Sequence, residues 1–315
     1  LGPNGAGKST LINILVTLLQ PDSGSVTING WPLATEAAKI RSSIGVIFQD
    51  SSLDERLTAH ENLYFHAMFY HVPPREASQR ITALLAMVGL ADRSNDRVIT
   101  FSGGMKRKLE IVRAFIHQPL ILFLDEPTSG LSSLDSENIL DLLNDLKLKG
   151  KLIFVVIHQP SSDIFKMFDR LIFLDTGGFM IYYGIPVGSI GYFKDRMHLP
   201  RYNDSECPAC GNVNPEQIFS IVESKVLDEF GRPTATRKVS PSEWSAYYNS
   251  RREESPPQPR PGNGIPEITL RTPGKLKQFM VFVKRDILAK LSDAQYLVIT
   301  LLEAPVLAFF LAYII

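Results

Sequence analysis

The first residues of the chain form a pattern that very few folds accommodate. Gly2-Pro-Asn-Gly-Ala-Gly-Lys-Ser9 places a glycine five residues before a Gly-Lys-Ser triplet. Glycines let the backbone curl so that successive N–H groups face one anion, while Lys8 adds a positive charge and Ser9 offers a hydroxyl to Mg²⁺. A helix expected from Thr10 to about Leu19 would point its positive N-terminus at the same anion. The pattern therefore predicts a phosphate-binding loop.

Short apolar segments bounded by turn residues recur through residues 1 to about 195, with helical patterns between them. Such segments are typical of buried strands, and their alternation with helices indicates an α/β domain. They lie at residues 25–29, 44–48, 120–124, 152–157 and 170–174. A strand should also precede the phosphate-binding loop, so we expect part of this domain to lie before Leu1.

Composition excludes several classes of protein. The chain has 315 residues, of which 44% are hydrophobic, with 33 basic and 33 acidic side chains. This balance argues against a nucleic-acid binder, which needs a net positive charge or a basic face. The apolar fraction excludes a disordered chain, and two cysteines exclude a disulfide scaffold.

A second element of the phosphate site appears in Ile121-Leu-Phe-Leu-Asp-Glu126. The four apolar residues predict a buried strand that ends at Asp125, which can hold the coordination shell of Mg²⁺. Glu126 follows and can polarise a water for attack on a phosphate. Open parallel sheets bind ligands at the carboxyl ends of their strands, so this position agrees with that of the glycine loop.

Three further motifs resemble those of ATP-binding cassette (ABC) proteins. Phe101-Ser-Gly-Gly-Met105 resembles the family's signature motif, whose common form is Leu-Ser-Gly-Gly-Gln, and it precedes the Asp125 strand as in that family. Gln49 and His158 each follow an apolar segment in the family's order. The resemblance covers residues 1–195 and implies an α/β fold: a P-loop NTPase ABC cassette with a helical signature subdomain.

Two segments indicate the subfamily. His158-Gln-Pro-Ser161 resembles the switch region of subfamily G half transporters, and residues 49–62 look more like drug-export ATPases of the daunorubicin type. Both groups work with ABC-2 type membrane domains. The resemblance implies an ATP-hydrolysing subunit of a membrane exporter for a hydrophobic or amphiphilic substrate. The alternative is a soluble or regulatory ABC ATPase that is not itself a transporter.

The resemblance also implies how the site would be assembled. Two cassettes, as a homodimer or a heterodimer, would sandwich ATP and Mg²⁺ head to tail. The nucleotide-binding residues implied on the near side are Asn4, Gly5, Ala6, Gly7, Lys8, Ser9 and Thr10, and those on the second cassette are Ser102, Gly103 and Gly104. The implied catalytic residues are Glu126, His158 and Gln49, and the implied Mg²⁺ shell comes from Ser9, Gln49 and Asp125.

Two positions depart from the family pattern, and one expected residue lies outside the chain. Met105 stands where the signature has Gln, and we expect activity to survive this change because Ser102 and backbone amides make most of the phosphate contacts. Ser132 stands where the family usually has Asp, with Asp135 three residues later. The aromatic residue that stacks on adenine would precede Leu1.

The remaining third of the chain divides into three segments. Residues 196–273 form a polar extension and a proline-rich linker, and residues 274–292 predict an amphipathic connecting helix with a basic face. Residues 294–315 contain one charged residue, Glu303, and predict a first transmembrane helix. The basic residues before it place the ATPase domain in the cytoplasm. We therefore expect a multi-pass protein of the plasma or inner membrane, in contact with lipid and with a transmembrane domain in the same chain or complex.

Two weaker signals remain open. Cys207-Pro-Ala-Cys210 has half the spacing of a structural zinc site, so two copies of the chain could supply four thiolates, or the segment is an unligated turn. Glu303 is costly in lipid and should face protein or a cavity, either in substrate handling or in a helix-packing contact.

Overall fold

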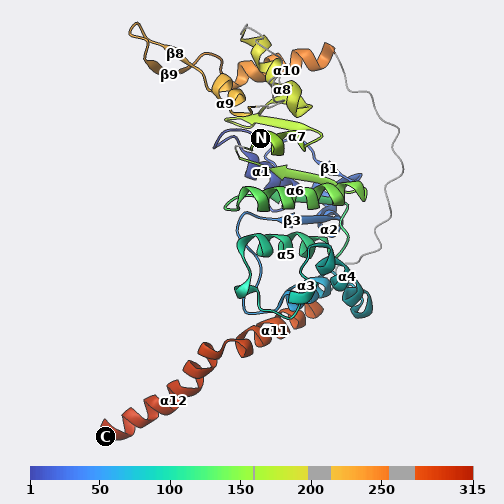
Figure 1. Cartoon of the computed structure of the whole chain (residues 1–315), viewed down its shortest axis with the longest axis vertical. Coiled ribbons are helices and arrows are strands. Elements are labelled where there is room, and N and C mark those ends of the chain that lie inside the picture. The colour runs from blue at the N-terminus through green and yellow to red at the C-terminus, as the bar shows by residue number, and fades with distance from the viewer. Residues whose placement is uncertain (159, 198–213, 255–273, 315) are drawn as a thin grey trace. The chain divides into compact units, whose positions relative to one another are not determined.

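The computed structural model describes residues 1–158, 160–197, 214–254 and 274–314 (Figure 1). The chain divides into two compact units. Unit 1 comprises Leu1–Ala34, Leu124–Thr128 and Phe154–Pro266, and unit 2 comprises Thr35–Phe123, Ser129–Ile153 and Glu267–Ile315. The chain passes from one unit to the other within α2 (Leu33–Ser43), β4 (Ile121–Asp125) and β5 (Leu152–Val156). Each unit is therefore built from segments that are distant in the sequence.

A three-stranded sheet has the order β3-β4-β5, where β3 is Ile44–Ile47. All three strands lie where apolar segments predict them, within one or two residues. In β4 the first four residues are buried and Asp125 is half-buried. The buried part of the strand ends before Asp125, because burying a carboxylate in an apolar environment without a partner is costly.

Unit 1 contains helices and short strands from its first segment, Leu1–Ala34, and from its last, Phe154–Pro266. They are α1 (Lys8–Leu15), β1 (Thr27–Ile28), β2 (Trp31–Pro32), α7 (Ser162–Lys166), β6 (Leu171–Asp175), β7 (Phe179–Gly184), α8 (Pro186–Arg196), α9 (Glu216–Val222), β8 (Lys225–Leu227), β9 (Pro233–Arg237) and α10 (Pro241–Glu254). Strands β6 and β7 pair antiparallel, with a register shift between Phe173 and Leu174. The predicted helix 10–19 is shorter than expected, because the chain leaves it after Leu15 and Thr17 has a φ of 68°.

The core of unit 1 is aromatic. Phe193 of α8 packs against Phe173 of β6 and against Trp244 of α10, with ring centroids 5.6 and 5.3 Å apart, and all three side chains are fully buried. Helix α10 also packs against β7. Burying side chains of this size contributes about 2–3 kcal/mol each before entropy is counted. The segment after residue 214 is therefore part of the folded core of unit 1.

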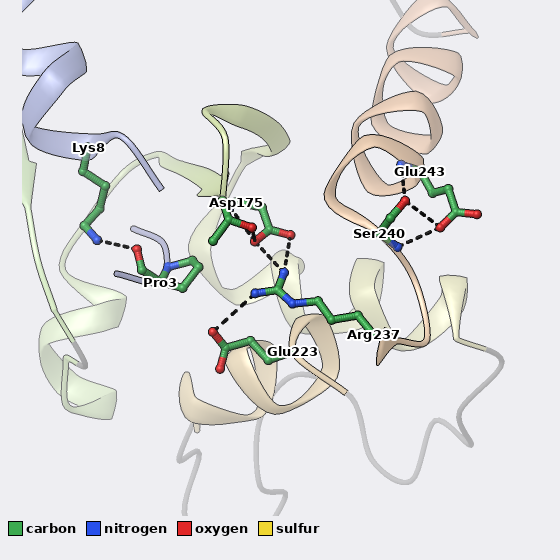
Figure 2. Close-up of polar contacts among 8 residues, drawn as sticks. Pro3, Lys8, Asp175, Glu223, Arg237, Ser240 and Glu243 are labelled. Atoms are coloured by element: carbon green, nitrogen blue, oxygen red, sulfur yellow. Dashed lines mark hydrogen bonds and ion pairs between the residues drawn. The ribbon is translucent and has the colours of Figure 1, made fainter. Parts of the chain in front are cut away.

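Polar contacts hold the same segment at two further points (Figure 2). Arg237, at the end of β9, donates to both carboxylate oxygens of the buried Asp175 at 2.8 and 3.0 Å, and its other nitrogen lies 3.7 Å from Glu223. Ser240 and Glu243 form reciprocal bonds at the start of α10, as in a capping box. The buried carboxylate thus has the charged partner that its desolvation requires.

Unit 2 is mainly helical around β3. Its helices and 3₁₀ turns are α3 (Ala59–Phe69), α4 (Pro74–Met87), η1 (Ala91–Arg93), η2 (Val98–Thr100), α5 (Gly103–Phe115), α6 (Ser133–Leu148), α11 (Lys275–Ser292) and α12 (Ala294–Ile314). Helix α3 begins with a complete capping box between Thr58 and Glu61. Helix α11 packs on it: Phe282 lies 4.4 Å from Phe69 between ring centroids, and Val281 joins a cluster with Leu57.

The last predicted segment forms a helix but is not supported as a transmembrane helix. Helix α12 spans Ala294–Ile314, and Glu303 and Pro305 interrupt its apolar sequence. Within the described ranges, no helix combines the length and the apolarity that a bilayer crossing requires. The prediction for residues 294–315 is corrected accordingly. The cysteine pair Cys207 and Cys210 and the proline-rich segment 256–273 lie outside the described residues.

His117 is an ionisable side chain in the interior of unit 2. Its Nε2 lies 3.0 Å from the Ile44 carbonyl, and its ring stacks on Tyr70 with centroids 3.7 Å apart. Burial lowers the pKa of His117 to about 4, and the hydrogen bond to Ile44 acts in the opposite direction. The pKa of His66, which lies nearby, is also lowered, mainly by burial. Both imidazoles are therefore neutral in the folded chain at neutral pH.

We predict that the chain loses stability as the pH falls from about 6.5 towards 4. Over this interval the unfolded chain protonates His117, whose unfolded pKa is about 6.5, and the folded chain does not. The loss reaches about 3 kcal/mol below the folded pKa and is absent at neutral pH. Urea unfolding of the whole chain at neutral and acid pH measures it. His117→Gln, which can still donate to the Ile44 carbonyl, should reduce the dependence, and the part that remains is expected from His66.

Candidate functional site

The phosphate-binding loop is fixed to β6 through its backbone. The Leu1 nitrogen donates to the Ile172 carbonyl and the Leu174 nitrogen donates to the Leu1 carbonyl, both at 2.9 Å. Gly2 has a φ of 155°, and a Cβ added to it would stand 2.1 Å from the Leu174 carbonyl oxygen. The glycine pattern at position 2 therefore has a steric cause, because only a residue without a side chain fits beside this strand.

The end of the loop prepares an anion site at α1. Gly5 and Gly7 have φ angles of 76° and 81°, in the left-handed region that glycine adopts without strain. Gly7 is the N-cap of α1, and no described side chain bonds to the first amides of that helix. Ser9 and Thr10 are exposed in its first turn. These unclaimed amides and the helix dipole favour an anion at this position.

Lys8 provides the cation of the loop. Its Nζ donates to the Gly2 carbonyl at 2.8 Å and to the Pro3 carbonyl at 2.9 Å, and Figure 2 shows the second of these bonds. Burial lowers the pKa of Lys8, while the charges of Glu126 and Asp125 act in the opposite direction. The ammonium group thus lies within electrostatic range of both acids, and the loop's own carbonyls hold it at the site.

The acids and the histidine reach the loop from the ends of β4 and β5. Asp125 ends β4, and Glu126 follows with a φ of 45°, an uncommon angle for a side chain of its size. The Glu126 nitrogen donates to the Val156 carbonyl at 3.0 Å. His158 Nε2 lies 3.2 Å from Asn4 Oδ1 in the phosphate loop. His158 is therefore bonded to the phosphate loop, and Asp125 and Glu126 act electrostatically on its Lys8, all within unit 1.

The predicted residues Gln49 and Ser102–Gly104 belong to unit 2. Gln49 is exposed just after β3. Helix α5 begins at Gly103, and Ser102 is its N-cap, accepting from the Met105 nitrogen at 3.3 Å. A Cβ added to Gly104 would lie 2.7 Å from Asp135 Oδ1, so the Asp135 side chain would have to shift to admit it. Ser132 caps α6 by accepting from the Asp135 nitrogen.

The donors present fit Mg²⁺ together with a phosphate better than a metal bound by protein alone. Within the described ranges, no three His, Cys, Asp or Glu side chains gather to hold a metal ion. Unit 1 instead offers the Asp125 carboxylate and the Ser9 hydroxyl beside the phosphate loop. Mg²⁺ commonly binds through one or two carboxylates and keeps waters and phosphate oxygens in its shell. The site therefore suits a nucleotide–Mg²⁺ pair.

Two features of the site were not predicted from the sequence. The contact between Asn4 and His158 joins residues 154 positions apart, and sequence spacing alone does not reveal it. Arg107, Glu110 and Arg113 contact the backbone on both sides of Gln49. The spacing of three between these charged residues could have indicated such contacts. It puts them on one face of α5, and charged side chains that become buried need partners.

Comparisons with known proteins agree with the motifs. Residues 1–129 match the sequence model of a family described as ABC transporter, and residues 158–201 match one described as ABC-2 type transporter. The linearmycin resistance ATP-binding protein LnrL of Bacillus subtilis is 40% identical over 177 residues, which are 56% of this chain and 57% of that protein. ABC transporter G family member 2 of Arabidopsis thaliana is 34% identical over 242 residues, 73% of this chain and 31% of that protein.

A solved structure gives the same result for the fold. The structure of an ATP binding subunit of an ABC transporter superposes with a TM-score of 0.55 at 32% identity, and the match covers 65% of this chain and 82% of that one. This confirms the predicted P-loop ABC ATPase fold. The chain spans a little over half the length of LnrL.

We predict that Gly2→Ala weakens nucleotide binding at least about tenfold, because the added Cβ would push the loop away from β6. Equilibrium titration of the whole chain with a fluorescent ATP analogue measures the dissociation constant. Gly24→Ala is the matched control: Gly24 also lies in unit 1 with a φ of 83°, and nothing lies within 4 Å of an added Cβ. Equal affinities in the two variants would contradict the steric role of Gly2.

Proposed function

The chain belongs to the ABC transporter family of ATP-binding proteins, and we propose that it is the ATP-hydrolysing part of a membrane exporter. The observation that carries this proposal is the grouping of Asn4, Lys8, Asp125, Glu126 and His158 around one phosphate-binding loop. Its members supply an anion site, a cation, a metal ligand and a base. Together these are the parts that phosphoryl transfer to water requires.

Binding of the triphosphate rests on the loop and on α1. The amides of Gly5, Ala6 and Gly7 and the first turn of α1 would face the phosphates, and Thr10 lies in the same turn. Lys8 would exchange its present bonds to Gly2 and Pro3 for phosphate oxygens. Asp125, Ser9 and Gln49 would hold the Mg²⁺ shell. The metal ion supplies positive charge that offsets the charge of the β- and γ-phosphates.

Hydrolysis rests on Glu126 and His158. The bond from the Glu126 nitrogen to Val156 fixes the backbone from which the carboxylate extends, so that the side chain can accept a proton from the attacking water. His158, held beside Asn4, would contact the terminal phosphate and orient that water. The positive φ of Glu126 costs conformational energy, and such strain is found mainly at functional sites.

A second cassette would complete each nucleotide site. Ser102, Gly103 and Gly104 stand at the N-terminus of α5, and in a head-to-tail pair this terminus would approach the terminal phosphate bound by the partner. ATP would then hold the two cassettes together, and hydrolysis would remove the bridging phosphate. The partner is a second copy of this chain or a related cassette.

The export role is supported by the kinds of protein that this chain resembles. One relative is named for linearmycin resistance, another for daunorubicin resistance, and a third belongs to the ABC transporter G family. The match to the ABC-2 type transporter family suggests a membrane component of that class, with the ATPase in the cytoplasm. We propose a hydrophobic or amphiphilic substrate. We also propose that α11, which is basic and exposes Leu276 and Phe279, lies at the membrane side, in contact with lipid.

Glu126→Gln tests the catalytic assignment. The substitution keeps the shape of the side chain but removes the base, so ATP turnover should fall about 10²–10⁴-fold while ATP affinity is retained. Phosphate release and nucleotide titration measure the two quantities, and gel filtration with ATP should show an accumulated dimer. Glu229→Gln, at an exposed position in the same unit, is the matched control. Unchanged turnover in Glu126→Gln would rule out this role.

A further inference from the structure

Helix α5 carries three charged residues on one face. Arg107, Glu110 and Arg113 follow one another at intervals of three, so their side chains lie along the same side of the helix. Arg107 and Glu110 are 8% and 3% exposed and form an ion pair at 2.8 Å. Charges so deeply buried need hydrogen-bonding partners beyond each other.

Those partners are backbone groups on both sides of Gln49. Arg107 Nη1 donates to the Phe48 carbonyl at 2.8 Å, and Glu110 Oε1 accepts from the Ser52 nitrogen at 2.9 Å. Arg113 Nη1 donates to the Ser52 carbonyl at 2.6 Å. The residue before Gln49 and the residue three positions after it are therefore both bound to α5, and only three residues separate the two anchors.

We infer that Arg107, Glu110 and Arg113 are positioning residues that hold Gln49 in its working place and make its position follow that of α5. We call these three residues the α5 clamp. The inference rests on the proposed function, in which Gln49 contributes to the Mg²⁺ shell. Gln49 is exposed and lies outside the helices and strands, and the anchored residues 48 and 52 enclose it on both sides.

The contacts of the buried Arg107–Glu110 pair favour a role in positioning the backbone over a role in stability alone. A buried ion pair is weak evidence for stability, because apolar residues of similar volume often serve as well or better. Here the pair instead directs its remaining donors and acceptors at main-chain groups of residues 48 and 52. The pKa of Arg113 is lowered mainly by burial, and Glu110 acts in the opposite direction. The clamp is thus one connected charge network.

The start of α5 explains why this link matters. Ser102 caps the helix at the signature motif, and Arg107 lies about one turn further along. In the proposed dimer, the signature motif serves the nucleotide of the partner, whereas Gln49 serves the nucleotide of its own cassette. A rigid helix that carries both means that closure on one nucleotide moves a ligand of the other. The α5 clamp is the physical connection between the two sites.

The test replaces the charged side chains of the α5 clamp with apolar side chains of similar volume. In Arg107→Met/Glu110→Met the buried charges are replaced together, which avoids leaving one charge unpaired. We expect kcat for ATP to fall at least about tenfold while the dissociation constant for ATP without Mg²⁺ stays within about twofold. Glu110→Gln, which keeps an acceptor for the Ser52 nitrogen, should lose less. Lys108→Met, on the same helix and outside the clamp, should behave as the wild type.

A double-mutant cycle separates positioning from general damage. If the α5 clamp acts through Gln49, Arg107→Met/Glu110→Met should cause no further loss of kcat in a Gln49→Ala background. A loss of the same size in both backgrounds would overturn the inference.

Hydrogen exchange gives a result independent of turnover. The Ser52 amide should exchange at least about tenfold faster in Arg107→Met/Glu110→Met than in the wild type, because Glu110 accepts from it. Unchanged exchange would overturn the inference even if turnover falls. A wild-type chain that binds ATP but does not hydrolyse it, alone or with its partner components, would overturn the proposed function instead, and the exchange result would still decide on the clamp.

Discussion

The close backbone contact between the start of the chain and β6 is the constraint on which the candidate site depends. Leu1 exchanges two backbone hydrogen bonds with this strand, and Gly2 passes the Leu174 carbonyl without room for a side chain. Because the loop is fixed at its entry, its last residues curl into α1 and leave the helix amides free of side-chain caps. Lys8 then lies between its own loop and the carboxylates that follow β4. The anion site is a product of main-chain geometry, with the charged side chains added to it.

Much of this could be predicted from the sequence, for a definite physical reason. Short apolar segments identified the strands because a strand buried on both faces, such as β4, consists of apolar residues. The glycine loop and the acids after β4 were identified because their chemistry tolerates few substitutes. The start of α5 is harder to place from sequence, because Gly103 and Gly104 are weak helix formers while Ser102 is a good N-cap.

Other features depend on contacts between distant positions and could not be predicted in the same way. The bond between His158 and Asn4, and the α5 clamp, join residues far apart in the sequence. The predicted membrane span at the C-terminus is not supported either, since no helix in the described ranges meets the length and apolarity of a bilayer crossing.

The burial of Trp244 has a consequence for how unit 1 responds to its ligand. Trp244 packs on Phe193, which packs on β6, and β6 is the strand that holds the phosphate loop. A ligand that binds only the folded state adds its binding free energy to every part that unfolds with the site. Residues 216–254 would therefore become harder to melt and slower to digest when nucleotide binds, although they are not part of the site. The stability of residues 216–254 would therefore report whether the phosphate loop holds a nucleotide.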